Sequence, residues 1–278
     1  MTATPKTIDI PFSDGYAARA RFWPGEKAAV LYLHGIQSHG LWFEASAGYL
    51  AEQGYAVLLP DRRGSGLNRE ARGDVRHFRR WIADTAELAR DLAHRTGKPK
   101  VHLLAVSWGG KLAAAAAQAH PELFASLTLV TPGIFPAVDL PLAVKIHIAL
   151  SIFARPRKPF PIPLNEPQLF TDNPVRQRFI ETDENRLTRV TARFLGHSIL
   201  LDRRVRIADL HFPFPVKLYL AGHERIIDNP RTLRLYRSWR APRKALACYD
   251  DACHTLEFEP DPSAYLADLK EWMDEVSA

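Results

Sequence analysis

The stretch LLAVSWGGK, from Leu103 to Lys111, changes character within three residues. An apolar run ends at a serine, and a tryptophan, two glycines and an alanine-rich segment follow. The pattern predicts a buried strand, a very tight turn at Ser107 and a helix that begins directly after the turn. Such a turn strains the backbone of its central residue, so the side chains close to it must be small. Gly109 and Gly110 meet that requirement.

Short apolar runs alternate with helical patterns along most of the chain. Runs that are apolar on both faces are typical of a parallel sheet covered by helices on each side. The predicted strands span residues 28–33, 55–59, 101–106, 127–130, 216–221 and 245–249, and the predicted helices span residues 41–53, 78–96, 108–120, 230–239 and 262–276. The alternation indicates the α/β class, with a mostly parallel central sheet flanked by helices. Residues 7–11 and 16–23 are expected to add an antiparallel edge pair.

One interval interrupts this alternation. From residue 133 to residue 215 no strand is predicted, and the interval holds an apolar helix over 140–154, a proline-rich stretch and a helical region over 174–201. Loops of this size in a compact domain are usually functional. We therefore expect a helical cap over residues 134–210, inserted into a core made of residues 1–133 and 211–278.

Charge narrows the classes of partner. The formal net charge is +6, and residues 134–210 hold 12 Lys and Arg against 8 Asp and Glu. A basic excess suits nucleic acid, an anionic lipid surface or an acidic substrate, but no nucleic-acid-binding motif accompanies it, so we expect no nucleic-acid partner. Most of the excess Lys and Arg side chains are expected to lie on the solvated surface. The basic, apolar cap raises the hypothesis of a peripheral contact with anionic membranes.

The N-terminus, the apolar stretch of the cap and the cysteines predict a cytoplasmic protein. Residues 1–15 contain no apolar core of signal-peptide length. Lys145 and His147 interrupt residues 140–154, which fall short of the ~20 residues that span a bilayer. Cys248 and Cys253 are too few for a disulfide framework and are expected to be reduced, mostly buried thiols.

Three stretches give the chain a resemblance to a known superfamily. AVSWG resembles the nucleophile elbow G-x-S-x-G, with Ala105 in place of the first glycine, while LHGIQSHG and PDRRGSG follow two predicted strands. From LYLHG to the C-terminal helix, the chain resembles the α/β-hydrolase superfamily, and more closely the capped serine hydrolases similar to monoacylglycerol lipases and lysophospholipases. The resemblance implies the α/β-hydrolase fold, Ser107 as nucleophile and an oxyanion hole formed by the backbone N–H groups of Ile36 and Trp108.

A serine nucleophile needs an adjacent base that is itself oriented by an acid. In this superfamily the chain order is nucleophile, acid, histidine. After His223 the sequence holds one histidine, His254, between the last predicted strand and the last predicted helix, so His254 is the predicted base. The acid is Glu224 or Asp228 in LAGHERIIDNP. We favour Glu224, which stands at the first position expected for the acid, because Asp228 is also suited to cap the helix that begins near Pro230.

Two glycine-rich stretches do not match nucleotide-binding motifs. Arg69 occupies the position of the third glycine of a dinucleotide fingerprint after Gly64 and Gly66, and Leu112 follows SWGGK where a phosphate-binding P-loop has Ser or Thr. The reaction is therefore predicted to need no cofactor and no metal.

The predicted function is a serine hydrolase that cleaves carboxylic esters with an apolar acyl group, such as a monoacylglycerol or a lysophospholipid, through an acyl-enzyme. Its partner would be a small-molecule ester or acyl-lipid substrate, and the sequence assigns no oligomeric state. The candidates to line an acyl pocket are Trp42, Phe43, Trp108, Phe135, Ile146, Leu150 and Phe153. Thioester cleavage, acyl transfer and C–C bond hydrolysis use the same triad, and a non-catalytic ligand-binding member is the alternative from another class.

Overall fold

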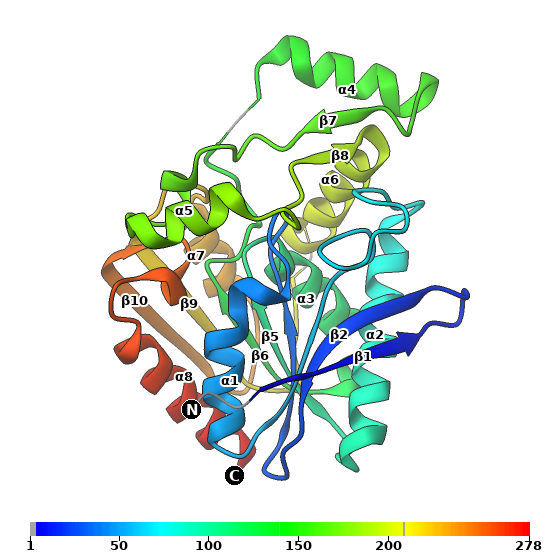
Figure 1. Cartoon of the computed structure of the whole chain (residues 1–278). Helices are drawn as coiled ribbons and strands as arrows, with labels where there is room; N and C mark the ends of the chain where they lie inside the picture. The colour runs from blue at the N-terminus through cyan, green and yellow to red at the C-terminus, as the bar shows by residue number, and fades with distance from the viewer. Residues whose placement is uncertain (1–3, 139, 208) are drawn as a thin grey trace.

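An eight-stranded sheet runs through the computed structural model, which describes residues 4–138, 140–207 and 209–278 (Figure 1). The strands lie in the order β1-β2-β4-β3-β5-β6-β9-β10. They are β1 (Lys6–Pro11), β2 (Ala17–Trp23), β3 (Ala29–Leu33), β4 (Ala56–Pro60), β5 (Val101–Val106), β6 (Phe124–Val130), β9 (Val216–His223) and β10 (Lys244–Cys253). From β4 to β10 every neighbouring pair is parallel, and β1 and β2 add an antiparallel edge. The predicted mostly parallel sheet is confirmed.

Helices cover both faces of this sheet. On one face α1 (Glu44–Glu52), which follows the short helix η1 (Gly40–Phe43), contacts α8 (Ser263–Ser277). On the other face α2 (Phe78–Thr96) contacts α3 (Trp108–Ala119). Two neighbouring residues of β6 show this division, because successive side chains of a strand point to opposite faces. Thr128 Oγ1 accepts a hydrogen bond of 2.9 Å from the indole of Trp272 in α8, whereas Leu129 lies against Gly110 of α3.

The central strands carry the core. Every residue of β3, β4 and β5 is buried, which is why these segments are continuously apolar rather than alternating. The edge strand β10 pairs with β9 on one side alone, and its residues alternate between half-buried and exposed over most of its length. Cys253 is buried, but Cys248 is exposed, so the expectation of two mostly buried thiols is wrong for Cys248.

The segment between β6 and β9, which we call the cap after its predicted role, lies over one end of the sheet, at the top of Figure 1. Its elements are α4 (Leu142–Ala154), β7 (Pro159–Pro161), η3 (Pro167–Leu169), α5 (Pro174–Thr182), β8 (Arg189–Thr191) and α6 (Ala192–Ile207). The prediction that this segment has no strand is wrong, because β7 and β8 pair antiparallel, and β8 divides the predicted helical region into α5 and α6. Strands of three residues, one of them bounded by prolines, are too short to leave a periodic signal.

The helix α7 (Asn229–Ser238) follows β9 and connects it to β10. Within the described residues, no helix combines the length and the apolar character that crossing a bilayer requires.

Candidate active site

The backbone at Ser107 is strained, as the sequence predicts. Ser107 has φ of 53° and ψ of −126°, a conformation that costs a side-chain-bearing residue about 1–3 kcal/mol. Three backbone hydrogen bonds hold the turn. The Ser107 N–H donates to Val130 O (3.0 Å), and the Ser107 carbonyl accepts from the N–H groups of Gly110 (2.8 Å) and Gly133 (2.7 Å). The turn projects from the end of β5 into the first turn of α3.

Two glycines allow this turn to form. A Cβ atom built on Gly109 would lie 2.6 Å from the carbonyl oxygen of His34, and one built on Gly110 would lie 2.6 Å from Cβ of Pro132. Because the first of these contacts is with rigid backbone, any residue larger than glycine at position 109 would push α3 away from β3. The prediction that small residues are required here is confirmed.

His254 and Glu224 form a buried, directly bonded pair. His254 Nδ1 lies 2.8 Å and 2.9 Å from the two carboxylate oxygens of Glu224, and both side chains are nearly inaccessible to solvent. The Glu224 carboxylate also accepts hydrogen bonds from the backbone N–H groups of Ile226 (2.7 Å) and Ile227 (3.2 Å), which fix its orientation. Since a carboxylate only accepts, Nδ1 carries the proton that bonds to Glu224, and in the neutral form of the ring Nε2 is the acceptor.

Asp228 lies outside this pair. Its carboxylate accepts a hydrogen bond from the backbone N–H of Arg231 (2.9 Å) and thereby caps the N-terminus of α7. Of the two acids predicted from the sequence, the structure brings Glu224 to His254 and uses Asp228 as a helix cap.

Ser107 and His254 line the same small cavity, together with Gly35, Ile36 and Phe170. His254 Nε2 is buried and has no hydrogen-bond partner among the described residues. A buried acceptor without a donor is costly, so a proton donor is expected to reach it. In enzymes without substrate, catalytic hydrogen bonds are often long and shorten when substrate binds.

Of the two predicted oxyanion donors, Ile36 lines this small cavity, whereas Trp108 lines the larger cavity beside Ser107 that is described below. As the first residue of α3, Trp108 has an N–H that no carbonyl within the helix accepts. A Cβ atom built on Gly133 would lie 3.0 Å from that nitrogen, so glycine at position 133 leaves the N–H accessible. Ile36 belongs to the loop of residues 34–40, which we call the oxyanion loop after its predicted role. A Cβ atom on Gly35 would lie 3.3 Å from Cβ of Ser107, which shows how closely this loop approaches the serine.

A buried histidine braces the oxyanion loop. The backbone N–H of Arg62 donates to His34 Nε2 (2.8 Å), so Nδ1 carries the proton and donates to the Gly35 carbonyl (2.8 Å). Burial lowers the pKa of His34 well below its ordinary value and keeps the ring neutral. These contacts give His34 a structural role, which is to hold the oxyanion loop in place.

A partly buried cation next to this loop was not singled out from the sequence. The Arg62 guanidinium donates to the carbonyl oxygens of Gly35 (2.9 Å) and Ile36 (3.0 Å) and lies 4.5 Å from the ring of Trp108. Burial lowers the pKa of Arg62 to about 9, so the group stays charged at neutral pH. The Gly35 carbonyl and the Ile36 N–H share one peptide group, so donation to the carbonyl polarises the N–H that is predicted to be an oxyanion donor. In the sequence, Arg62 is one of two adjacent arginines in PDRRGSG, and nothing in that stretch distinguishes it as a contact of the oxyanion loop.

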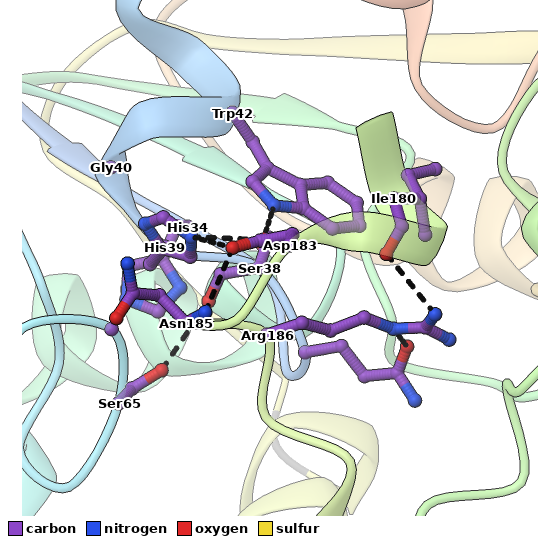
Figure 2. A network of polar contacts seen from close by, with 12 residues as sticks. His34, Ser38, His39, Gly40, Trp42, Ser65, Ile180, Asp183, Asn185 and Arg186 are labelled. Carbon is purple, nitrogen blue, oxygen red and sulfur yellow. Dashed lines mark hydrogen bonds and ion pairs between the residues drawn. The ribbon is translucent and has the colours of Figure 1, made fainter. Parts of the chain in front are cut away.

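Side chains of the cap form hydrogen bonds with the oxyanion loop, as Figure 2 shows for Asp183 and His39. Asp183, which follows α5, accepts hydrogen bonds from His39 Nε2 (2.9 Å) and Trp42 Nε1 (2.7 Å). Burial raises the pKa of a carboxyl, but the bonds from His39 and Trp42 outweigh it and hold the pKa of Asp183 below its usual value. Arg186 Nε donates to Gln37 Oε1 (3.0 Å). Cap residues far away in the sequence thus fix the loop that carries Ile36.

A larger cavity of about 380 Å³ opens beside Ser107 between the core and the cap. Its walls are mostly aliphatic, and they include Ile148, Ile152, Ile162, Leu164, Leu195 and Ile226. The volume falls within the range of ligand pockets in proteins.

Most of the predicted lining residues lie elsewhere. Trp108 lines the large cavity, and Trp42 and Phe43 line the small one. Phe135 is buried between the guanidinium groups of Arg206 and Arg231, each 4.5 Å from its ring. The cap residues Ile146, Leu150 and Phe153 are exposed. The sequence did not reveal the orientation of α4, whose Ile148 and Ile152 face the cavity instead.

Among the residues that the structure describes, no three His, Cys, Asp or Glu side chains are grouped in a way that could hold a metal ion.

This fold defines an α/β hydrolase. The sequence matches the family described as serine aminopeptidase, S33, over residues 24–261, and the chain belongs to this family. No curated protein sequence matches the chain.

Solved structures of lipases and esterases have the same fold. The monoacylglycerol lipase of Paleococcus ferrophilus is similar at 18% identity and a TM-score of 0.83, covering 93% of this chain and 99% of its own. A soluble variant of the monoglyceride lipase of Saccharomyces cerevisiae, in complex with a substrate analogue, is 18% identical with a TM-score of 0.84, covering 100% and 97%. A thermophilic esterase of Thermogutta terrifontis is 19% identical with a TM-score of 0.70, covering 98% and 100%.

The contacts of Arg62 lead to a test of its electrostatic role. We expect Arg62→Met to lower kcat for ester hydrolysis roughly 10- to 100-fold, with a smaller change in KM, because the charge acts on a donor used in the transition state. Steady-state kinetics with a nitrophenyl ester measures both constants. The matched control is Arg63→Met, since Arg63 pairs with Asp84 and Asp14, away from the serine. A wild-type kcat in Arg62→Met would contradict this role.

Proposed function

We propose that the protein is a serine hydrolase that cleaves carboxylic esters with a largely apolar acyl group through a Ser107-His254-Glu224 triad. The observation that carries the proposal is the buried His254–Glu224 pair, which leaves Nε2 without a partner in the cavity that Ser107 lines. The strained turn at Ser107 supports it, because backbone strain of this kind is concentrated at functional sites.

The proposed reaction has two halves. His254 Nε2 takes the proton of the Ser107 hydroxyl while Oγ attacks the ester carbonyl, and the backbone N–H groups of Ile36 and Trp108 donate to the oxygen that becomes negative. The tetrahedral intermediate collapses, His254 returns the proton to the departing alkoxide, and an acyl-enzyme remains. Water then attacks the acyl-enzyme with His254 as base, which releases the acid and restores Ser107. Glu224 stabilises the imidazolium in both halves.

The large cavity supports an acyl-lipid substrate. Its aliphatic walls next to Ser107 suit a hydrocarbon chain. Two structural neighbours are a monoacylglycerol lipase and a monoglyceride lipase, and we extend that class of substrate to this protein as part of the proposal. Another neighbour of the same fold is a 2-hydroxy-6-oxo-6-phenylhexa-2,4-dienoate hydrolase. We favour an ester with an aliphatic acyl chain over a phenyl-substituted dienoate as the substrate, because the walls of the cavity are mostly aliphatic.

Covalent labelling tests the nucleophile. We expect a fluorophosphonate probe to label the wild-type protein and to leave Ser107→Ala unlabelled, because phosphonylation needs an activated serine. Ser13→Ala, which changes an exposed serine in the turn after β1, should label like the wild type. A folded wild-type protein that does not label would refute the enzymatic function and favour a ligand-binding role.

A pair of carboxylate variants tests the acid. Glu224→Gln should lose kcat/KM by roughly two to four decades, because it removes the charge that orients and stabilises the imidazolium. Asp228→Asn should lose far less, since asparagine also caps helices well. The measurement is hydrolysis of one nitrophenyl ester by both variants. The opposite ranking would assign the acid to Asp228.

We also propose that the cap contacts anionic membranes through α4. Leu142, Ile146, Leu150 and Phe153 follow one another at helical spacing and are exposed, with Phe153 89% accessible. Arg155 and Arg157 are exposed directly after the helix. An exposed apolar stripe next to basic side chains matches the chemistry of an anionic lipid surface.

Vesicle sedimentation tests this contact. We expect the protein to bind vesicles of anionic phospholipid more than neutral ones, and binding to weaken with salt and in the double variant Leu150→Ser, Phe153→Ser. Val175→Ser, which removes an exposed apolar side chain of α5, is the control that should bind normally. Binding that is indifferent to both lipid charge and salt would contradict the proposal.

A further inference from the structure

A lysine is buried in the wall of the large, mostly aliphatic cavity. Lys111 lies four residues after Ser107 on α3 and is 5% exposed. It lines the cavity together with Ser198 and Asp202 of α6. Burying a charge among aliphatic side chains is costly unless the charge is paired and hydrogen-bonded. The proposed ester hydrolysis alone does not explain why this polar group is there.

The three side chains form one hydrogen-bonded cluster between the core and the cap. Lys111 Nζ donates to Asp202 Oδ1 (2.7 Å) and to Ser198 Oγ (3.0 Å). The indole N–H of Trp108 donates to the same Oγ (2.9 Å). Arg206 lies 3.5 Å from the other Asp202 oxygen. The charge of Lys111 is therefore matched by Asp202, and burial lowers the pKa of Lys111.

The donors of this cluster outnumber its acceptors. An ammonium group has three protons, and the two bonds given above use two of them. Ser198 Oγ accepts two hydrogen bonds, which occupy both of its lone pairs, so its own proton remains to be donated. Within the described residues, neither the third ammonium proton nor the Ser198 proton has an oxygen or nitrogen acceptor, although Nζ lies 5.6 Å from the Trp108 ring. Unused donors in an apolar cavity favour a ligand that brings an acceptor.

We propose that Lys111, Ser198 and Asp202 form a polar subsite that binds a hydroxyl or keto oxygen carried by the acyl chain. This inference rests on the proposed ester hydrolysis and specifies its substrate further. Because the Asp202 carboxylate lies in the same wall of the cavity and would repel a second carboxylate, the subsite takes an uncharged oxygen. Four residues of helix rise about 6 Å, so the oxygen lies a few carbons from the carbonyl that Ser107 attacks.

Matched esters test the subsite. The substrates are nitrophenyl octanoate and a set of nitrophenyl keto-octanoates in which the ketone is moved along the chain, each corrected for its rate of hydrolysis by hydroxide. We expect kcat/KM of the wild type to be roughly 10- to 100-fold higher for the best keto ester than for octanoate, the gain of a hydrogen bond to a charged donor. In Lys111→Met this ratio should fall to about one.

A second variant separates specificity from folding. Lys111→Met, Asp202→Leu replaces the whole pair with apolar side chains, which is often neutral for stability, and should also lose the keto preference. The control is Lys217→Met, Asp268→Leu, which removes a partly buried pair between β9 and α8 and should keep the wild-type ratio. Fluorophosphonate labelling of each variant reports whether it folds with an active serine.

The outcomes are distinct. A wild type that hydrolyses octanoate but prefers no keto ester would overturn the subsite and leave the proposed function standing. A preference that survives in the Lys111 variants would also overturn it. Faster cleavage of a matched ester whose chain ends in a carboxylate would show an anion site and contradict the uncharged ligand. A wild type that neither labels nor hydrolyses any ester would instead refute the proposed function.

Discussion

The backbone conformation of Ser107 is the constraint on which the rest of the site depends. A residue with positive φ between β5 and α3 places its side chain in the cavities at the end of the sheet and leaves the Trp108 N–H without a partner inside the helix. The strain is offset by hydrogen bonds from Gly110 and Gly133 and by a sheet whose strands are buried on both faces. Glycine is required at position 109, where this turn meets the end of β3. The close packing brings residues that are distant in the sequence together at one site.

Buried charges tie the cap to the core on both sides of this turn. On one side Asp183 of the cap accepts from His39 and Trp42, and on the other Lys111 of α3 pairs with Asp202 of α6. Arg62 supplies a further, partly buried cation below the oxyanion loop. Breaking such a pair by removing one partner typically costs about 3–5 kcal/mol, so the cap is expected to affect the rate as well as the choice of substrate.

The sequence predicted the features that depend on local pattern. The parallel strands, the tight turn and the glycines around it follow from periodicity and turn chemistry, and the choice of Glu224 over Asp228 matches the contact with His254 in the structure. The features it missed depend on how distant elements meet. Arg62 and Lys111 are ordinary basic residues until the fold buries them, β7 and β8 are too short for periodicity, and the orientation of α4 is set by the rest of the cap.

A crystal structure of the protein inhibited by an alkyl fluorophosphonate tests the central claim most directly. The account requires phosphorus bonded to Ser107 Oγ with φ of Ser107 still positive, and a phosphoryl oxygen about 3 Å from the backbone nitrogens of both Ile36 and Trp108. It also requires the alkyl chain to lie in the cavity beside Lys111. An adduct on another side chain, or a Ser107 that has relaxed to negative φ with its oxygen facing other donors, would contradict it.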